Sequence, residues 1–246
     1  MEEEKQFNFT LILILKTKNT MKKIFLSIGL LFTLGIATAV FNSCGDDKDE
    51  PKKEEPTDPI NPNDPTYPST TDSGVVINGI KWATRNVDKP GTFAANPGSE
   101  GMFYQWNRKT AWAATGSVTN WDSATPAGTE WTAANDPSPA GWRVPTYAEG
   151  QTLLNTEKVT SEWTTQNGVN GYKFTDKTTN NSLFLPAAGY RNSSDGTLGD
   201  AGSYGNYWSS TQDRRYYAYG LGFYSGYAGW GDGFRSYGFS VRAVAE

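Results

Sequence analysis

The chain of 246 residues contains no histidine and a single cysteine. Without histidine there is no Ser-His-Asp or Cys-His catalysis, no HExxH zinc site and no imidazole that titrates near neutral pH. With one cysteine there is no internal disulfide and no thiolate cluster for zinc. We therefore expect no catalytic residues, no metal site and no cofactor in this protein.

Positive charge is also scarce. The formal net charge is −4 and the isoelectric point is near 5.1. Nucleic-acid binders normally carry a basic face, so this composition argues against a nucleic-acid partner. No internal repeat of about 20–50 residues is visible, which argues against a solenoid or a propeller.

The N-terminal part of the chain reads as an export signal. Met21-Lys22-Lys23 is a short basic start, and an apolar run from Ile24 to Phe41 ends at Asn42-Ser43-Cys44. This order describes a secretory signal, and a sole cysteine placed directly after it resembles the lipobox of bacterial lipoproteins. We expect residues 21–43 to be a lipoprotein signal peptide and Cys44 to be lipidated. The alternative is an uncleaved membrane anchor, because about 18 apolar residues can just cross a bilayer.

Residues 1–20 do not fit that pattern, because their acidic start has the wrong charge for a signal peptide. We expect translation to begin at Met21 and residues 1–20 to be an unstructured, mis-assigned upstream start. Residues 45–74 hold six prolines, nine acidic residues and one aromatic. Such a segment buries too little apolar surface to fold, so we expect residues 44–74 to be a disordered tether. In an extended form it would reach roughly 90 Å.

A folded domain is expected over residues 75–246. Asn78-Gly79 between two apolar runs predicts a hairpin, since both turn residues take positive φ. Thr146 followed by Glu149 predicts a capping box and a helix, and another helix is expected between Met102 and Ala114. Short strands are expected elsewhere, listed here by range: Tyr172–Phe174, Leu183–Leu185, Tyr207–Ser209, Tyr217–Phe223 and Phe239–Val244. Strands with few, early helices predict an α+β fold with much irregular loop.

Catalytic patterns are weak. Asp122, Glu130 and Asp136 lie in one loop-like stretch and could pair as in a glycosidase, but no spacing places two of them on one face. The glycine-rich run 229–233 is followed by no helix and carries no Lys-Ser/Thr, so it does not read as a phosphate loop.

The region from Gly202 to Phe239 is the most distinctive part of the chain. Its 38 residues include eight tyrosines, two tryptophans, three phenylalanines and nine glycines. This amino-acid composition is close to that of antibody recognition loops, in which aromatic rings supply contact area and glycine allows unusual backbone conformations. Strand alternation from Tyr217 to Phe223 turns Leu221 and Phe223 to the core, and turns Ala218, Gly220 and Gly222 outward. The expected ligand-binding residues are Tyr204, Asn206, Tyr216, Tyr224, Tyr227, Trp230, Asp232, Arg235 and Tyr237.

Several blocks of residues occur together in an order that resembles a known family. They are Ile77–Thr84, Phe103–Trp106, Asp136–Thr146, Leu183–Arg191, Tyr207–Thr211 and Gly238–Arg242. The series resembles the fibrobacter succinogenes major paralogous domain (FISUMP), which is found in many bacterial surface lipoproteins. The resemblance spans residues 75–244 and implies an α+β, C-type-lectin-like domain with few helices, short antiparallel strands and extensive irregular loops. Many relatives carry cysteines, which form a disulfide, where this chain has Ser138 and Ala243. The resemblance therefore implies that this fold is held by packing alone.

These features together predict a non-enzymatic recognition domain on a lipid-anchored tether, facing outward from the outer membrane. Its expected partners are the membrane, through the N-terminal lipid, and an extracellular glycan or protein. Relatives of that fold diversified by retroelements also recognise ligands through exposed positions, which implies a diversifiable surface between Tyr204 and Tyr237. Two alternatives remain: a structural component of the cell envelope, and a carbohydrate-active enzyme that uses paired carboxylates.

Overall fold

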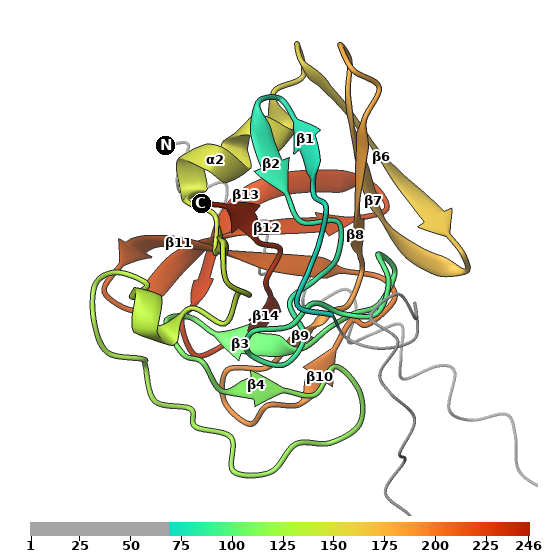
Figure 1. The fold of residues 1–246 in the computed structure, drawn as a ribbon. Helices are drawn as coiled ribbons and strands as arrows, with labels where there is room; N and C mark the ends of the chain where they lie inside the picture. The colour runs from blue at the N-terminus through green and yellow to red at the C-terminus, as the bar shows by residue number, and fades with distance from the viewer. Residues whose placement is uncertain (1–68) are drawn as a thin grey trace, which may run out of the picture. The chain divides into compact units, whose positions relative to one another are not determined.

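The computed structural model describes residues 69–246, and strands dominate this part of the chain (Figure 1). Of these residues, 41% lie in strands and 6% in helices. The expectation of an α+β, C-type-lectin-like domain is therefore wrong, because a single short α-helix does not form a helical layer. The physical reason is that most aromatic residues within 69–246 lie in strands, where such side chains pack well.

The strands form three sheets. One sheet has the order β1-β2-β15-β5, with bounds Val75–Ile77, Ile80–Trp82, Val244–Ala245 and Trp142–Arg143. A second has the order β6-β7-β8, with bounds Val159–Gln166, Val169–Asp176 and Ser182–Pro186. The largest has the order β10-β9-β14-β11-β12-β13, with bounds Leu198–Gly199, Tyr190–Arg191, Gly238–Ser240, Gly205–Arg214, Tyr217–Tyr224 and Tyr227–Phe234. Two further strands, β3 (Phe103–Gln105) and β4 (Ala111–Trp112), join it beside β14.

The hairpin expected at Asn78-Gly79 is confirmed. These two residues connect β1 to β2, and their φ angles are 46° and 83°. The expected strands in residues 172–174, 183–185, 207–209 and 217–223 are also confirmed, each inside a longer strand. The range 239–244 is divided between β14 and β15, with residues 241–243 between them.

The predicted capping box is confirmed as well. Helix α2 (Tyr147–Gln151) begins after Thr146, whose side chain accepts a hydrogen bond from the Glu149 backbone, while the Glu149 carboxylate accepts from the Thr146 backbone. Hydrogen bonds from Arg143 and Thr146 outweigh the burial cost and lower the pKa of Glu149 to about 2. A 3-10 turn, Thr152–Leu154, follows directly and buries Leu153.

The helix expected between Met102 and Ala114 is absent from the described structure. That segment forms β3 and β4, and Phe103–Gln105 are all buried between β14 and β4. Asn107 has a φ of 54°, which no α-helix tolerates. A further 3-10 turn occupies Ala133–Asn135. Pairing with β14, far along the chain, therefore decides the conformation of this segment.

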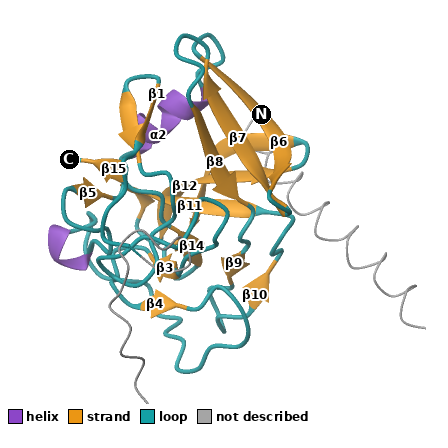
Figure 2. Ribbon diagram, turned by 45° about the vertical axis from the view of Figure 1, so that its right-hand side comes forward, coloured by secondary structure: helices purple, strands orange, loops and turns teal. Residues whose placement is uncertain are grey.

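The core lies between the sheets. Its largest cluster joins Leu221 and Phe223 of β12 to residues of the sheet β6-β7-β8, which stands beside β11–β13 (Figure 2). A second cluster contains Phe93 and Tyr104, and a third contains Trp106, Trp208 and Phe239. Because β12 has β11 and β13 as neighbours and packs against two clusters, it is covered on both faces over much of its length.

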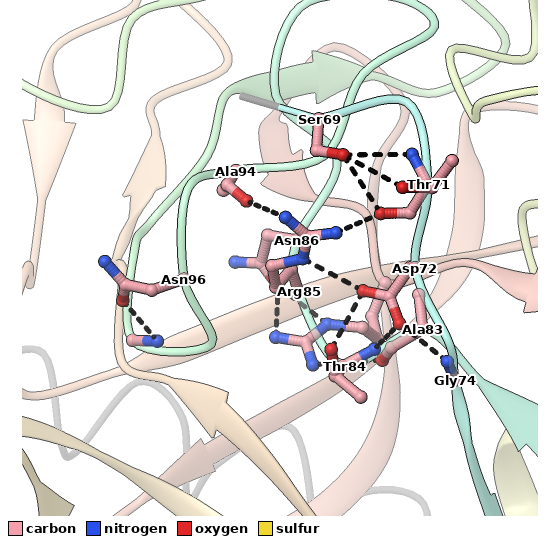
Figure 3. Close-up of polar contacts among 12 residues, drawn as sticks. Ser69, Thr71, Asp72, Gly74, Ala83, Thr84, Arg85, Asn86, Ala94 and Asn96 are labelled. Atoms are coloured by element: carbon pink, nitrogen blue, oxygen red, sulfur yellow. Dashed lines mark hydrogen bonds and ion pairs between the residues drawn. The ribbon is translucent and has the colours of Figure 1, made fainter. Parts of the chain in front are cut away.

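Residues 69–74, which we expected to belong to the tether, contact the domain (Figure 3). Ser69 and Phe93 exchange two backbone hydrogen bonds. The carboxylate of Asp72 accepts from the backbone of Gly74, from the backbone and hydroxyl of Thr84 and from the guanidinium of Arg85. Burial disfavours the charged carboxylate, but these hydrogen bonds outweigh it and lower the pKa of Asp72. The described contacts therefore begin at least six residues before Val75.

Buried arginines hold the irregular loops. Arg191 is fully buried and donates to the carbonyls of Ala113, Thr115, Gly116 and Gly196. Arg242, 1% exposed, donates to the Asn86 side chain and to the Ala83 carbonyl. Burial lowers the pKa of Arg242 to about 10. Carbonyl oxygens thus satisfy these cations in place of carboxylates, which ties long loops to the sheets.

The predictions for the N-terminal part of the chain lie outside the described residues. They concern residues 1–20, the signal at residues 21–43, Cys44 and the tether up to residue 68. Within residues 69–246, no helix is both long enough and apolar enough to cross a membrane.

Candidate functional site

Strands β12 and β13 bring four glycines together on one face of the large sheet. The register pairs Gly222 with Gly229 and Gly220 with Gly231. Side chains alternate along a strand, so these positions share a face. The opposite face of β12 carries Leu221 and Phe223, which are buried in the core, as expected.

These glycines form the floor of a groove of about 170 Å³. Tyr204 and Asn206 border it on the side of β11, Tyr227 lies over one part of it, and Phe239 closes it on the side of β14. The groove is therefore a strip of bare backbone between aromatic walls.

The glycines have different reasons to be there. A Cβ at Gly229 would collide with the Tyr227 hydroxyl at 1.9 Å, so the position of Tyr227 requires that glycine. A Cβ at Gly220 would approach the Tyr207 carbonyl to 3.2 Å. A Cβ at Gly231 would meet no atom within 4 Å, and one at Gly222 would make only ordinary contacts. Glycine inside a strand weakens the strand. No packing contact among the described residues requires a glycine at position 231.

Three tyrosines form an aromatic rim at one end of the groove. The ring centroids of Tyr204 and Tyr224 are 5.6 Å apart, and those of Tyr224 and Tyr227 are 5.8 Å apart. Tyr224 is 38% exposed and Tyr227 is 50% exposed. Their rings remain open to solvent, which suits contact with a ligand.

The polar groups of the groove are not used inside the protein. Within residues 69–246, the Asn206 amide and the hydroxyls of Tyr204, Tyr224 and Tyr227 have no hydrogen-bond partner, and the polar side-chain atoms of Tyr204 and Asn206 are not buried. Burial, followed by the neighbouring phenols of Tyr224 and Tyr227, raises the pKa of Tyr204. The Tyr204 phenol therefore stays protonated at neutral pH, and the groove offers one amide and three phenols for hydrogen bonding.

Three of the nine expected ligand residues line this groove with their side chains, Tyr204, Asn206 and Tyr227, and a fourth, Tyr224, packs against the two tyrosines at its edge. Trp230 and Asp232 border it by position, but alternation turns their side chains to the other face. The Trp230 ring lies against Gly150 of α2, and the Asp232 carboxylate pairs with Arg214 at 2.5 Å. Trp230 therefore belongs to the packing of α2, and not to the ligand surface where we expected it.

Arg235 is also not where we expected it. It is 2% exposed, its guanidinium lies 4.2 Å from the Trp106 ring, and it donates to the carbonyls of residues 126–128. Tyr237 stacks on Phe239 behind the groove, with centroids 5.5 Å apart. Tyr216 is 45% exposed, but it lies against Arg215 away from the groove.

The groove lies on the face of β12 that strand alternation turns outward, but much less of that face is open than we expected. Ala218 and Gly220, which we expected to face outward, are buried. Trp208 and Phe239 cover this face near Ala218 and Gly220, and it stays open beside Gly222. The alternating glycines at 220, 222, 229 and 231 were the available signal, because folding the chain at Ser225-Gly226 brings them into pairs.

Two of the three carboxylates considered for catalysis, those of Asp122 and Asp136, make hydrogen bonds within the fold. Asp122 binds the Arg108 guanidinium at 2.6 Å and the backbone of Ala124. Asp136 accepts from the backbones of Ser138 and Val144. Glu130 is exposed. Nothing in these contacts brings two carboxylates to one site.

A larger hollow of about 620 Å³ lies beside Asn107 and Arg108. It is a weaker candidate, because its polar groups already hold loops together. The Asn107 side chain bonds to Ala127, Thr132 and Asn135, and Arg108 bonds to Asp122. Among the described residues, no group of three or more Asp, Glu or Cys side chains is placed to hold a metal ion.

The groove lies inside a segment that is similar to one recognised family. Residues 157–244 match DUF8237, a domain of unknown function. The match begins just before β6 and covers all of β11, β12 and β13. No curated protein and no solved structure matches the chain.

Proposed function

We propose that this protein is a surface lipoprotein whose folded part is a non-catalytic ligand-recognition domain, adhesin-like in role. The observation that carries the proposal is the groove between β11, β12 and β13. Exposed tyrosine rings and polar groups without partners surround a glycine floor there, and Gly231 leaves space that the fold itself does not need. Such a surface costs stability, so we infer that it is kept for binding.

The side chains of the groove supply the apolar contacts and hydrogen bonds that recognition of a ligand requires. The ring faces of Tyr224 and Tyr227 supply apolar contact with few rotatable bonds, and Asn206 and the phenols supply orienting hydrogen bonds. The carboxylates of Asp122 and Asp136 are occupied by structural contacts, which supports binding over paired-carboxylate hydrolysis.

The surface location rests on the N-terminal sequence. A signal at residues 21–43, a lipid on Cys44 and an acidic, proline-rich tether would carry the domain outward from the outer membrane. The resemblance to FISUMP lipoproteins supports the same location. Labelling with a radioactive fatty acid tests the anchor: we expect label on the full chain and none on the Cys44→Ala variant. Equal labelling of both proteins would refute it.

The test of recognition compares three tyrosines of similar exposure. The full chain is applied to a glycan array and to pull-downs from bacterial and host surfaces. We expect Tyr224→Ala and Tyr227→Ala to weaken the interaction more than tenfold, while Tyr216→Ala, outside the groove, leaves it within twofold. If all three variants bind like the parent protein, the groove is not the recognition site.

One observation favours a second candidate, a structural component of a surface assembly. Strand β13 ends the order of the large sheet, so among the described residues it has a strand neighbour on one side only. An unpaired edge strand is a template for pairing with another chain. Light scattering after size-exclusion chromatography separates the two functions, because assembly through β13 predicts an oligomer and recognition alone predicts a monomer.

A further inference from the structure

We propose that the groove binds a neutral sugar ring, such as one unit of a glycan chain, and that this ring lies flat on the glycine floor. This inference rests on the proposed recognition function and narrows its ligand class. It is argued from the size of the groove, its charge and the arrangement of its polar groups.

The size of the groove indicates a single ring. Its volume of about 170 Å³ is well below the roughly 300–1,000 Å³ of sites that enclose drug-sized ligands. The floor at Gly222 and Gly231 is bare backbone, so a flat ligand can approach it closely. A sugar ring has this shape, with an apolar C–H face and hydroxyls around its edge.

The walls of the groove match both parts of such a ring. Tyr204 and Tyr227 present aromatic surface beside the floor, against which the C–H groups of a sugar ring can pack. The Asn206 amide carries a donor and an acceptor side by side, which suits a pair of neighbouring hydroxyls. Each sugar hydroxyl both donates and accepts, so the phenols at the rim can bond to the same ligand.

Charge argues against acidic sugars, phosphates and charged peptides. Among residues 69–246, Asp232 carries the only carboxylate beside the groove, and its side chain points to the other face and pairs with Arg214. No lysine or arginine lines the groove among the described residues. A ligand held in this way gains little from ionic attraction, so its affinity should change little with salt.

Gly231 provides the sharpest test, because a Cβ there would project from the floor of the groove and meet no other described atom within 4 Å. Neutral and acidic oligosaccharides are titrated against the full chain, and tyrosine and tryptophan fluorescence is followed at low and high salt. We expect a neutral oligosaccharide to bind with an affinity that changes less than twofold between the two salt concentrations. Gly231→Val and Asn206→Ala should each weaken binding more than tenfold. Ser161→Val, on exposed strand β6, is the matched control and should bind like the parent protein.

Each possible result either supports or overturns the inference that the groove binds a neutral sugar. Binding of acidic ligands only, binding that falls steeply with salt, or no neutral sugar bound at millimolar concentration overturns the inference. So does neutral-sugar binding that Gly231→Val leaves unchanged. If Gly231→Val and Tyr227→Ala instead abolish binding of a protein partner, the recognition function stands and the sugar assignment fails. If neither variant affects any interaction of the protein, both proposals fail together.

Discussion

The guanidinium of Arg235 lies 4.2 Å from the ring of Trp106, on the inside of the protein. Its Nη2 atom donates to the carbonyls of Pro126, Ala127 and Gly128, and Nη1 donates to that of Arg215. One side chain thus joins the end of β13 to a long loop that has no regular structure of its own. A cation on a flat aromatic ring is favourable, and the carbonyls accept from both Nη atoms, while the buried Nε has no partner among the described residues.

Arg235→Lys should therefore destabilise the domain. A lysine keeps the charge but cannot reach several carbonyls at once or stack as a plane. We expect a loss of about 2–4 kcal/mol in the free energy of unfolding, measured by urea denaturation. Arg215→Lys, an exposed neighbour, is the control and should change stability by less than about 0.5 kcal/mol. Equal stabilities of the two variants would show that the carbonyl contacts contribute nothing.

Asp72 should make the stability depend on acid pH. Its pKa is lowered in the folded state, since hydrogen bonds from Thr84, Gly74 and Arg85 outweigh the burial cost. The stabilisation is then complete above the unfolded pKa of about 3.9 and is lost as the pH falls through the lower folded value. We expect Asp72→Asn to cost about 1.5–3 kcal/mol at pH 7, and the difference from the parent protein to shrink toward pH 2.

Urea denaturation at several pH values measures this effect. Glu162→Gln is the control, because Glu162 forms a solvent-exposed pair with Lys173 and should contribute less than about 1 kcal/mol. A cost of Asp72→Asn that stays constant from pH 7 to pH 2 would contradict the assigned role of the carboxylate.

Two serines should respond in opposite ways to the same substitution. The Ser138 hydroxyl is buried and has no hydrogen-bond partner within residues 69–246, whereas the Ser209 hydroxyl donates to the Tyr219 carbonyl at 2.9 Å. Removing an unsatisfied buried hydroxyl relieves a desolvation cost, so Ser138→Ala should be neutral or stabilising by up to about 1 kcal/mol. Ser209→Ala should cost about 1–2 kcal/mol. Thermal unfolding of both variants checks this, and a destabilised Ser138→Ala would imply a partner for that hydroxyl.

Gly150 should tolerate no side chain, although it lies in a helix. A Cβ there would come within 2.1 Å of the Trp230 ring. Alanine gains up to about 1 kcal/mol of helix propensity, but overpacking costs typically about 1–3 kcal/mol, so Gly150→Ala should be destabilising overall. A double-mutant cycle with Trp230→Leu measures the cause. The cost of Gly150→Ala should disappear in the Trp230→Leu background, and an unchanged cost would place the conflict elsewhere.

Short-range chemistry made part of this fold predictable. The Asn78-Gly79 turn and the capping box of Thr146 and Glu149 are set by neighbouring residues, and both formed as expected. The helix expected near residues 102–114 failed, because Phe103–Gln105 pair with β14, more than a hundred residues away along the chain. The intrinsic helix propensity of a short segment is weak compared with pairing between distant strands. For the same reason the fold is rich in β-strands, and not α+β as we expected.

The candidate site was predictable in composition but not in arrangement. Strand alternation separates side chains into two sets, but it does not say which set the rest of the protein covers. Phe239 and Trp208 cover the face at Ala218 and leave the stretch beside Gly222 open. The prediction that Arg235 is exposed was wrong for a similar reason, since the Pro126 carbonyl to which it donates lies 109 residues earlier in the chain.

The sequence by itself determined that this chain has no imidazole and no pair of cysteines, which turn needs positive φ, and that tyrosine and glycine are abundant near the C-terminus. Only the tertiary structure decided which of those tyrosines share a surface, that Trp230 packs on α2, and that Gly231 opens into solvent. The reason is physical: residue type limits what a side chain can do, whereas its partners depend on contacts between distant segments that form only when the sheets assemble.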